Sequence, residues 1–142
     1  MSITKEWELL GMQEVSKVVA VTLKKMQEYA RPGMTTKELD EYGGELLQFF
    51  GARSAPYITY GFPGYTCISV NEAMAHGIPS EKIILKEGDL INIDVSASLN
   101  GFWADNGGSF VLGNADNEKQ RLVNASKKSY IQPFILSKEV FV

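Results

Sequence analysis

The chain has 142 residues, of which 44% are hydrophobic, 11% aromatic and 22% charged, values that are typical of a globular protein and predict one domain over residues 1–142. Its 14 lysines and arginines against 17 acidic residues give a net charge of −3, which argues against a nucleic-acid partner. Cys67 is the only cysteine, so an internal disulfide and a cysteine-based zinc cage are excluded. Because no signal peptide or membrane span is recognisable, we expect a cytoplasmic protein without membrane contacts.

Two helices are predicted at the beginning of the chain. Apolar residues at helical spacing predict the first over residues 5–30, and a Pro-Gly pair ends it. Thr35 and Glu38 form a capping box that starts a second helix, which ends near residue 50. Gly43-Gly44 lies inside this segment, and each glycine costs up to about 1 kcal/mol relative to alanine. The sequence therefore leaves open whether the second helix is broken at these glycines.

The middle of the chain predicts loops and short strands. Residues 52–64 are rich in proline, glycine and tyrosine and predict a loop, which a strand over residues 65–70 follows. Residues 71–79 are expected to be irregular, and residues 83–85 to form a short strand. This region therefore contributes strands to a sheet while leaving long stretches without regular structure.

A β-hairpin is the clearest local prediction. From residue 90 onward apolar and polar residues alternate, which predicts a strand with one buried and one polar face. Asn100-Gly101 favours a two-residue turn, because both turn positions need a positive φ. Counting back from this turn places Ser96 opposite Asp105 and makes Asp94 and Asp105 diagonal neighbours on one face.

The end of the chain is unusually apolar. Residues 114–132 predict a weakly amphipathic helix that Pro133 ends. Residues 126–142 form an apolar tail, and chain ends are normally polar. We expect self-association through residues 131–136 and 140–142, since uncovered apolar surface promotes it.

Three polar side chains are candidates for chemistry. Asp94 and Asp105 predict a divalent-metal site, although an ordinary polar strand face facing water would show the same alternation. His76 lies in a loop with glycine and proline, where its imidazole could donate to a reacting carbonyl, carry a proton or simply face solvent. Cys67 lies in a predicted strand and is interpreted as a small buried apolar residue rather than a nucleophile.

Four motifs in order resemble the type I methionine aminopeptidases, and the likeness extends over about residues 5–125. The motifs are Gly61-Phe62-Pro63-Gly64-Tyr65-Thr66-Cys67-Ile68-Ser69-Val70-Asn71-Glu72, His76-Gly77-Ile78-Pro79, Gly88-Asp89-Leu90-Ile91-Asn92-Ile93-Asp94-Val95 and Gly101-Phe102-Trp103-Ala104-Asp105. The resemblance implies an α/β (α+β) chain with an antiparallel sheet, flanking helices and the pita-bread fold, in which two related halves enclose a two-metal site. It also implies removal of the N-terminal methionine from nascent proteins, with two divalent ions (Co, Mn, Fe or Zn) as cofactors.

The resemblance also implies roles for five residues. Asp94 corresponds to the first metal-binding aspartate and Asp105 to the aspartate that bridges both metals. His76 corresponds to the histidine that contacts the substrate at the scissile bond. Phe62 and Cys67 fall at positions that line the pocket for the methionine side chain.

Part of the family's site has no counterpart in the sequence. The family takes one further histidine and two glutamates from its second half, and one of those glutamates moves the proton. No histidine follows His76, so the resemblance covers the N-terminal half and implies a partial pita-bread fold with the C-terminal half missing. Near the chain end, Gln132 stands where a similar family segment has a glutamate. We therefore expect little activity of this chain alone, and the alternative is a non-catalytic remnant that binds a partner or a complementary fragment.

Overall fold

A four-stranded antiparallel sheet forms the centre of the computed structural model, which describes the backbone of residues 3–114 and 117–140 and the side chains of 3–114 and 118–131. The elements in chain order are α1 (Glu6–Tyr29), α2 (Thr36–Phe49), β1 (Arg53–Ser54), α3 (Ala55–Tyr60), β2 (Cys67–Val70), β3 (Leu90–Leu99), β4 (Phe102–Val111) and α4 (Asn117–Val140). Strand β3 pairs antiparallel with each of the other three strands. The predicted mixture of helices and antiparallel strands is confirmed.

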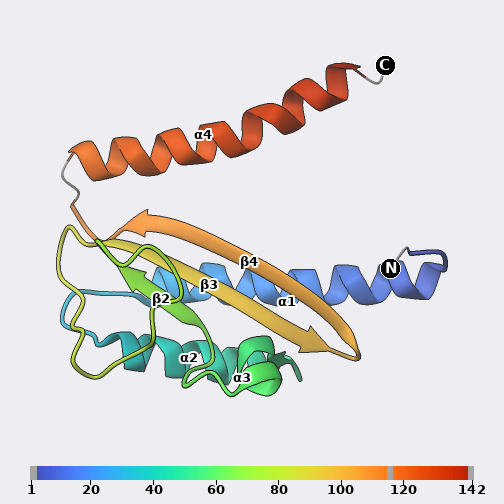
Figure 1. The fold of residues 1–142 in the computed structure, drawn as a ribbon, viewed down its shortest axis with the longest axis horizontal. Coiled ribbons are helices and arrows are strands. Elements are labelled where there is room, and N and C mark those ends of the chain that lie inside the picture. Colours follow the sequence, from blue (N-terminus) through green and yellow to red (C-terminus); the bar gives the residue numbers. More distant parts are fainter. Residues whose placement is uncertain (1–2, 115–116, 141–142) are drawn as a thin grey trace.

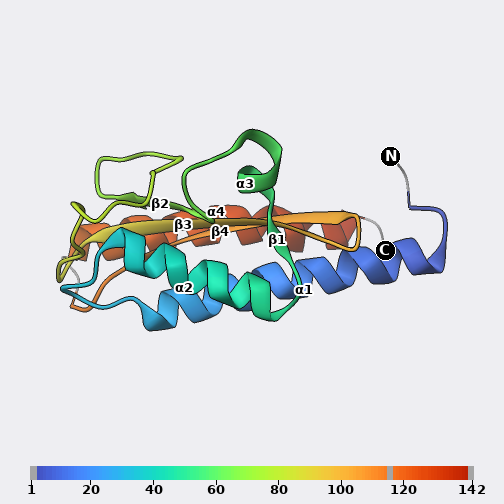
Figure 2. The ribbon, with the colours of Figure 1, turned by 90° about the horizontal axis from the view of Figure 1, so that it is seen from below.

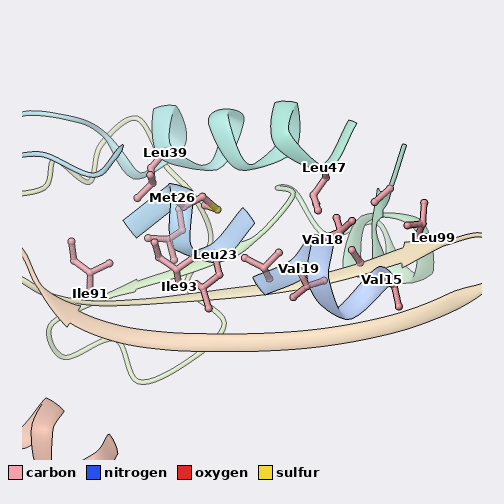
Figure 3. Close-up of a cluster of buried hydrophobic side chains, with 14 of the residues drawn as sticks. Val15, Val18, Val19, Leu23, Met26, Leu39, Leu47, Ile91, Ile93 and Leu99 are labelled. Atoms are coloured by element: carbon pink, nitrogen blue, oxygen red, sulfur yellow. The ribbon is translucent and has the colours of Figure 1, made fainter. Parts of the chain in front are cut away.

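The helices cover the two faces of the sheet unequally. Figure 2 shows α1 and α2 on one face and the short α3 on the other. In Figure 1, α4 lies beside β4 at the edge of the sheet. The core fills the space between α1, α2 and β3; Met26 of α1 lies beside Ile93 of β3 at one end of this cluster, and Val15 of α1 lies at the other end (Figure 3). These side chains are fully buried, and each contributes on the order of 1.5–3 kcal/mol by leaving water.

Helix α2 continues without a break through Gly43 and Gly44, and other side chains pack closely against both glycines. A Cβ atom at Gly43 would lie 2.6 Å from the Met26 sulfur, and one at Gly44 would lie 2.4 Å from the Tyr65 ring. The capping box of Thr35 with Glu38 is present as predicted. The cost of the two glycines in helix propensity is therefore offset by tight packing against α1 and the loop before β2.

The prediction of a loop over residues 52–64 was wrong, since this segment contains β1 and α3. Ser54 caps α3 by accepting a hydrogen bond from the Tyr57 N–H at 3.4 Å, and Pro56 occupies its first turn. Gly61 ends the helix with a φ of 66°. The predicted strand over residues 83–85 was also wrong, because only an isolated bridge between Thr35 and Ile84 forms there.

The β3–β4 hairpin is confirmed in turn and register. Asn100 and Gly101 have φ values of 52° and 84°, as a primed two-residue turn requires. Leu99 pairs with Phe102 on either side of the turn. Strand β4 continues from the turn to Val111, because ten successive residue pairs with β3 form along its length.

Helix α4 runs through Pro133 to Val140, so the prediction that this proline ends the helix was wrong. A proline removes one backbone hydrogen bond and kinks a helix, but residues on either side can keep helical angles. The side chains of residues 132–142 lie outside the described part, so self-association through residues 131–136 and 140–142 stays a prediction. In the described residues no helix combines the length and apolarity needed to cross a bilayer.

Candidate metal and substrate site

The two candidate metal ligands lie on the polar face of the sheet, opposite α1. Residues opposite each other in antiparallel strands point to the same face. Cys67 of β2 lies opposite Asp94 of β3, and Ser96 lies opposite Asp105 of β4. The predicted placement of both aspartates on one face is therefore confirmed, and Cys67 shares this face with them.

The electrostatics of this face show that the two carboxylates act on each other. Burial, and then the charge and hydrogen bonding of Asp105, raise the pKa of Asp94 to about 6. The charge of His76 acts in the opposite direction and lowers the pKa of Asp94. The histidine and the carboxylate pair therefore belong to one electrostatic cluster, although His76 lies 18 positions before Asp94 in the sequence.

Cys67 is buried beside this cluster and stays protonated. Burial raises the pKa of its thiol to about 11, with further contributions from Asp94, Asp40 and Asp105. A thiolate would add negative charge next to two carboxylates, which is unfavourable. The interpretation of Cys67 as a small apolar residue rather than a nucleophile agrees with these surroundings.

The loop that carries His76 is attached to β2 through Gly77. The Ile68 N–H donates to the Gly77 carbonyl at 2.9 Å, and the Gly77 N–H donates to the Ser69 hydroxyl at 3.1 Å. A Cβ atom at Gly77 would lie 2.1 Å from the Ile68 carbonyl oxygen, so only glycine fits there. His76 itself has a φ of 55°, which is uncommon for a residue other than glycine. Its side chain is exposed.

The other predicted substrate residue, Phe62, lies just after α3. Its ring is half-buried and meets Tyr60 edge to face, with ring centroids 6.5 Å apart. This contact does not by itself connect Phe62 with the carboxylate pair. Its role in substrate binding therefore stays a prediction.

A buried aspartate that the sequence analysis missed holds the loop between Phe62 and β2. Asp40 of α2 is fully buried, and its Oδ1 accepts hydrogen bonds from the Tyr65 and Thr66 N–H groups at 3.0 and 2.7 Å and from the Thr66 hydroxyl at 2.8 Å. Burial raises its pKa, while these hydrogen bonds act in the opposite direction. The available signal was its position three residues before Gly43, on the buried side of α2.

The Asp94 and Asp105 carboxylates on the polar face suit a divalent cation and could supply two of its ligands. Carboxylate oxygens are ligands for such ions, and a cation between Asp94 and Asp105 would relieve their repulsion. Within residues 3–114 and 118–131, no three histidine, cysteine, aspartate or glutamate side chains come together as a metal-binding group. The described part therefore offers two carboxylates and leaves further ligands to be supplied from elsewhere.

The repulsion between the carboxylates predicts a pH-dependent stability of the metal-free chain. Because the pKa of Asp94 is raised in the folded state, the stability it contributes is complete below its ordinary pKa and is lost as the pH rises through about 6. Asp94→Asn should therefore raise the free energy of unfolding near pH 7.5 by roughly 1 kcal/mol, allowing for solvent screening at this half-buried site, and should have no effect near pH 4.

Thermal unfolding of both proteins in the presence of a chelator measures this difference. Glu81→Gln serves as the control, because it neutralises an exposed carboxylate in another part of the chain. If Asp94→Asn shifted the melting temperature equally near pH 7.5 and near pH 4, the prediction would be contradicted.

Comparison with known proteins places this site in a family. Residues 11–132 match the model of metallopeptidase family M24. The chain is 46% identical to methionine aminopeptidase 2 of Bacillus subtilis over 130 residues, which are 92% of this chain and 52% of that protein. The crystal structure of methionine aminopeptidase from Rickettsia prowazekii matches with a TM-score of 0.86 and 30% identity, over 92% of this chain and 52% of that one.

A second solved structure gives the same result. Methionine aminopeptidase from Thermotoga maritima matches with a TM-score of 0.85 and 28% identity, over 90% of this chain and 51% of that one. The chain thus spans about half the length of the relatives it matches, and the expectation of a partial pita-bread fold is confirmed. Because the family match extends over most of the sequence and includes both aspartates and His76, the chain belongs to metallopeptidase family M24.

Proposed function

We propose that this chain contributes to a divalent-metal-dependent aminopeptidase that removes the N-terminal methionine from newly made proteins. The observation that carries the proposal is the pair of Asp94 and Asp105 on one face of the sheet, with His76 near enough for its charge to act on Asp94. Relatives at 46% and 44% identity that are named methionine aminopeptidase support the choice of reaction. The substrate is then a peptide or nascent chain that begins with methionine.

Asp94 and Asp105 are the residues that would hold the metal. We propose two divalent ions per site, as the family resemblance implies, with Co, Mn, Fe and Zn all compatible with oxygen and nitrogen ligands. When bound, such ions make water nucleophilic near neutral pH and polarise a carbonyl. The remaining ligands would come from outside the described residues.

His76 and two neighbours would bind the substrate. The exposed imidazole of His76 would donate a hydrogen bond to the scissile carbonyl and stabilise the negative charge that develops on its oxygen. Cys67, a protonated and buried thiol next to Asp94, offers a soft apolar contact to a methionine side chain. Phe62 would form a further apolar wall.

Complementation with a relative tests this proposal. The chain is mixed with the part of the Bacillus subtilis relative that it does not match, Mn²⁺ is added, and methionine release from a Met-Ala-Ser peptide is followed. We expect release that His76→Ala and Asp94→Asn each lower about 10²–10⁴-fold. Ser98→Ala, which changes another residue on the polar face of β3, should leave the rate unchanged.

The second candidate function is binding without catalysis. It is favoured by the finding that only two carboxylates meet among the described residues, with no third ligand beside them. In that case the two polypeptides would associate, as seen by analytical ultracentrifugation, but release no methionine. Association without turnover would therefore reject the enzymatic proposal and support an interaction module.

A further inference from the structure

Ser96 stands next to the carboxylate pair and contacts one of its members directly. Its hydroxyl donates a hydrogen bond to Oδ1 of Asp105 across the two strands. Leu99 and Phe102 flank the two-residue turn and form a hydrogen-bonded pair. Hydrogen-bonded and non-hydrogen-bonded pairs alternate along antiparallel strands, so Ser96 and Asp105, three pairs further on, form a non-hydrogen-bonded pair. Side chains of such pairs approach most closely, which allows the short serine side chain to reach the carboxylate.

We propose that Ser96 is a positioning residue, whose hydroxyl holds the Asp105 carboxylate in one orientation for the binding of divalent ions. This inference rests on the proposed metal site. Asp105 is exposed on β4, the edge strand of the sheet, and without a hydrogen-bond partner its side chain would sample several rotamers. A hydroxyl that fixes one oxygen reduces the entropy lost when the carboxylate binds a cation. Groups that orient metal ligands typically change metal affinity 10–100-fold when they are removed.

A second cross-strand hydrogen bond provides a matched control. The Asn92 side-chain amide donates to the Ser109 hydroxyl at 2.9 Å, and this pair also joins β3 to β4 on the polar face. Removing the Ser109 hydroxyl breaks a bond of the same kind that involves neither aspartate. If Ser96 only stabilised the hairpin, Ser96→Ala and Ser109→Ala would therefore have the same consequences.

The experiment compares Ser96→Ala, Ser96→Thr and Ser109→Ala with the unaltered chain in two measurements. In metal-free protein, the three-bond NMR couplings from the backbone nitrogen and carbonyl carbon to Cγ of Asp105 report its χ1 rotamer. Calorimetric titration with Mn²⁺ gives the dissociation constant. Circular dichroism verifies that each variant is folded.

We expect Ser96→Ala to average the Asp105 couplings and to weaken Mn²⁺ binding about tenfold. Ser96→Thr keeps the hydroxyl in a residue that suits a strand, so it should stay within about twofold of the unaltered chain, as should Ser109→Ala. Unchanged Asp105 couplings in Ser96→Ala, or equal effects of Ser96→Ala and Ser109→Ala, would overturn the inference. Absence of Mn²⁺ binding by the unaltered chain would overturn the part of the inference that concerns metal affinity, while the couplings would still decide whether Ser96 orients Asp105.

Discussion

Loaded with Mn²⁺ but without a complementary polypeptide, the chain should release methionine from a Met-Ala-Ser peptide at least 10²–10⁴-fold more slowly than the complemented mixture. The reason lies in the ligands that the structure brings together. Asp94 and Asp105 can bind a cation, but no third metal-binding side chain joins them among the described residues. Two carboxylates alone do not fix the ion, and water beside an ion that is not fixed is neither oriented nor activated for attack.

The rate of methionine release by the purified chain tests this expectation. Asp94→Asn and His76→Ala serve as controls for contaminating enzyme, because a contaminant would be insensitive to both substitutions. The prediction would be contradicted if the chain alone turned over the peptide within about tenfold of the rate of the mixture and if both substitutions abolished this turnover. Such a result would mean that the chain completes its own site, for example through a second copy.

Gly77→Ala should displace His76 and destabilise the chain, although the substitution adds only a methyl group. The new Cβ atom would lie 2.1 Å from the Ile68 carbonyl oxygen, a backbone atom that is held in β2. The loop can avoid this clash only by giving up its hydrogen bonds to Ile68 and Ser69. We expect the free energy of unfolding to fall by about 1–3 kcal/mol.

The single histidine makes this displacement directly measurable. His76 gives the only histidine ring signals in an NMR spectrum of the chain, and these should shift or broaden in Gly77→Ala. Met74→Ala is the matched control, because Met74 lies in the same loop with 93% of its side chain exposed. If both variants show the same ring signals and the same stability, Gly77 does not hold the loop against β2.

The β3–β4 hairpin could be predicted because its determinants are local. Asn100-Gly101 specifies the turn, and the period of two along the strands then assigns each side chain to a face. The common face of Asp94 and Asp105 follows from this counting alone. The same holds for the capping box at Thr35, whose partner lies three residues away.

Elements that depend on distant contacts could not be predicted with the same certainty. Residues 52–64 show the glycine, proline and tyrosine content of a loop, yet Ser54 and Gly61 cap a short helix there once the segment is held against the sheet. Helix α2 is continuous because Met26 and Tyr65 occupy the space beside its glycines. Pro133 indicated a helix end from its chemistry alone, but α4 continues past it.

The sequence by itself determined the residue types of the site, the turn and the face on which both carboxylates lie, since each of these depends on neighbours within a few residues. Only the tertiary structure decided that His76 comes close enough to change the pKa of Asp94 and that Asp40 holds the loop before Cys67. These placements depend on hydrogen bonds and packing between segments far apart in the chain. No periodicity or spacing encodes such contacts, because they form only when the whole core has assembled.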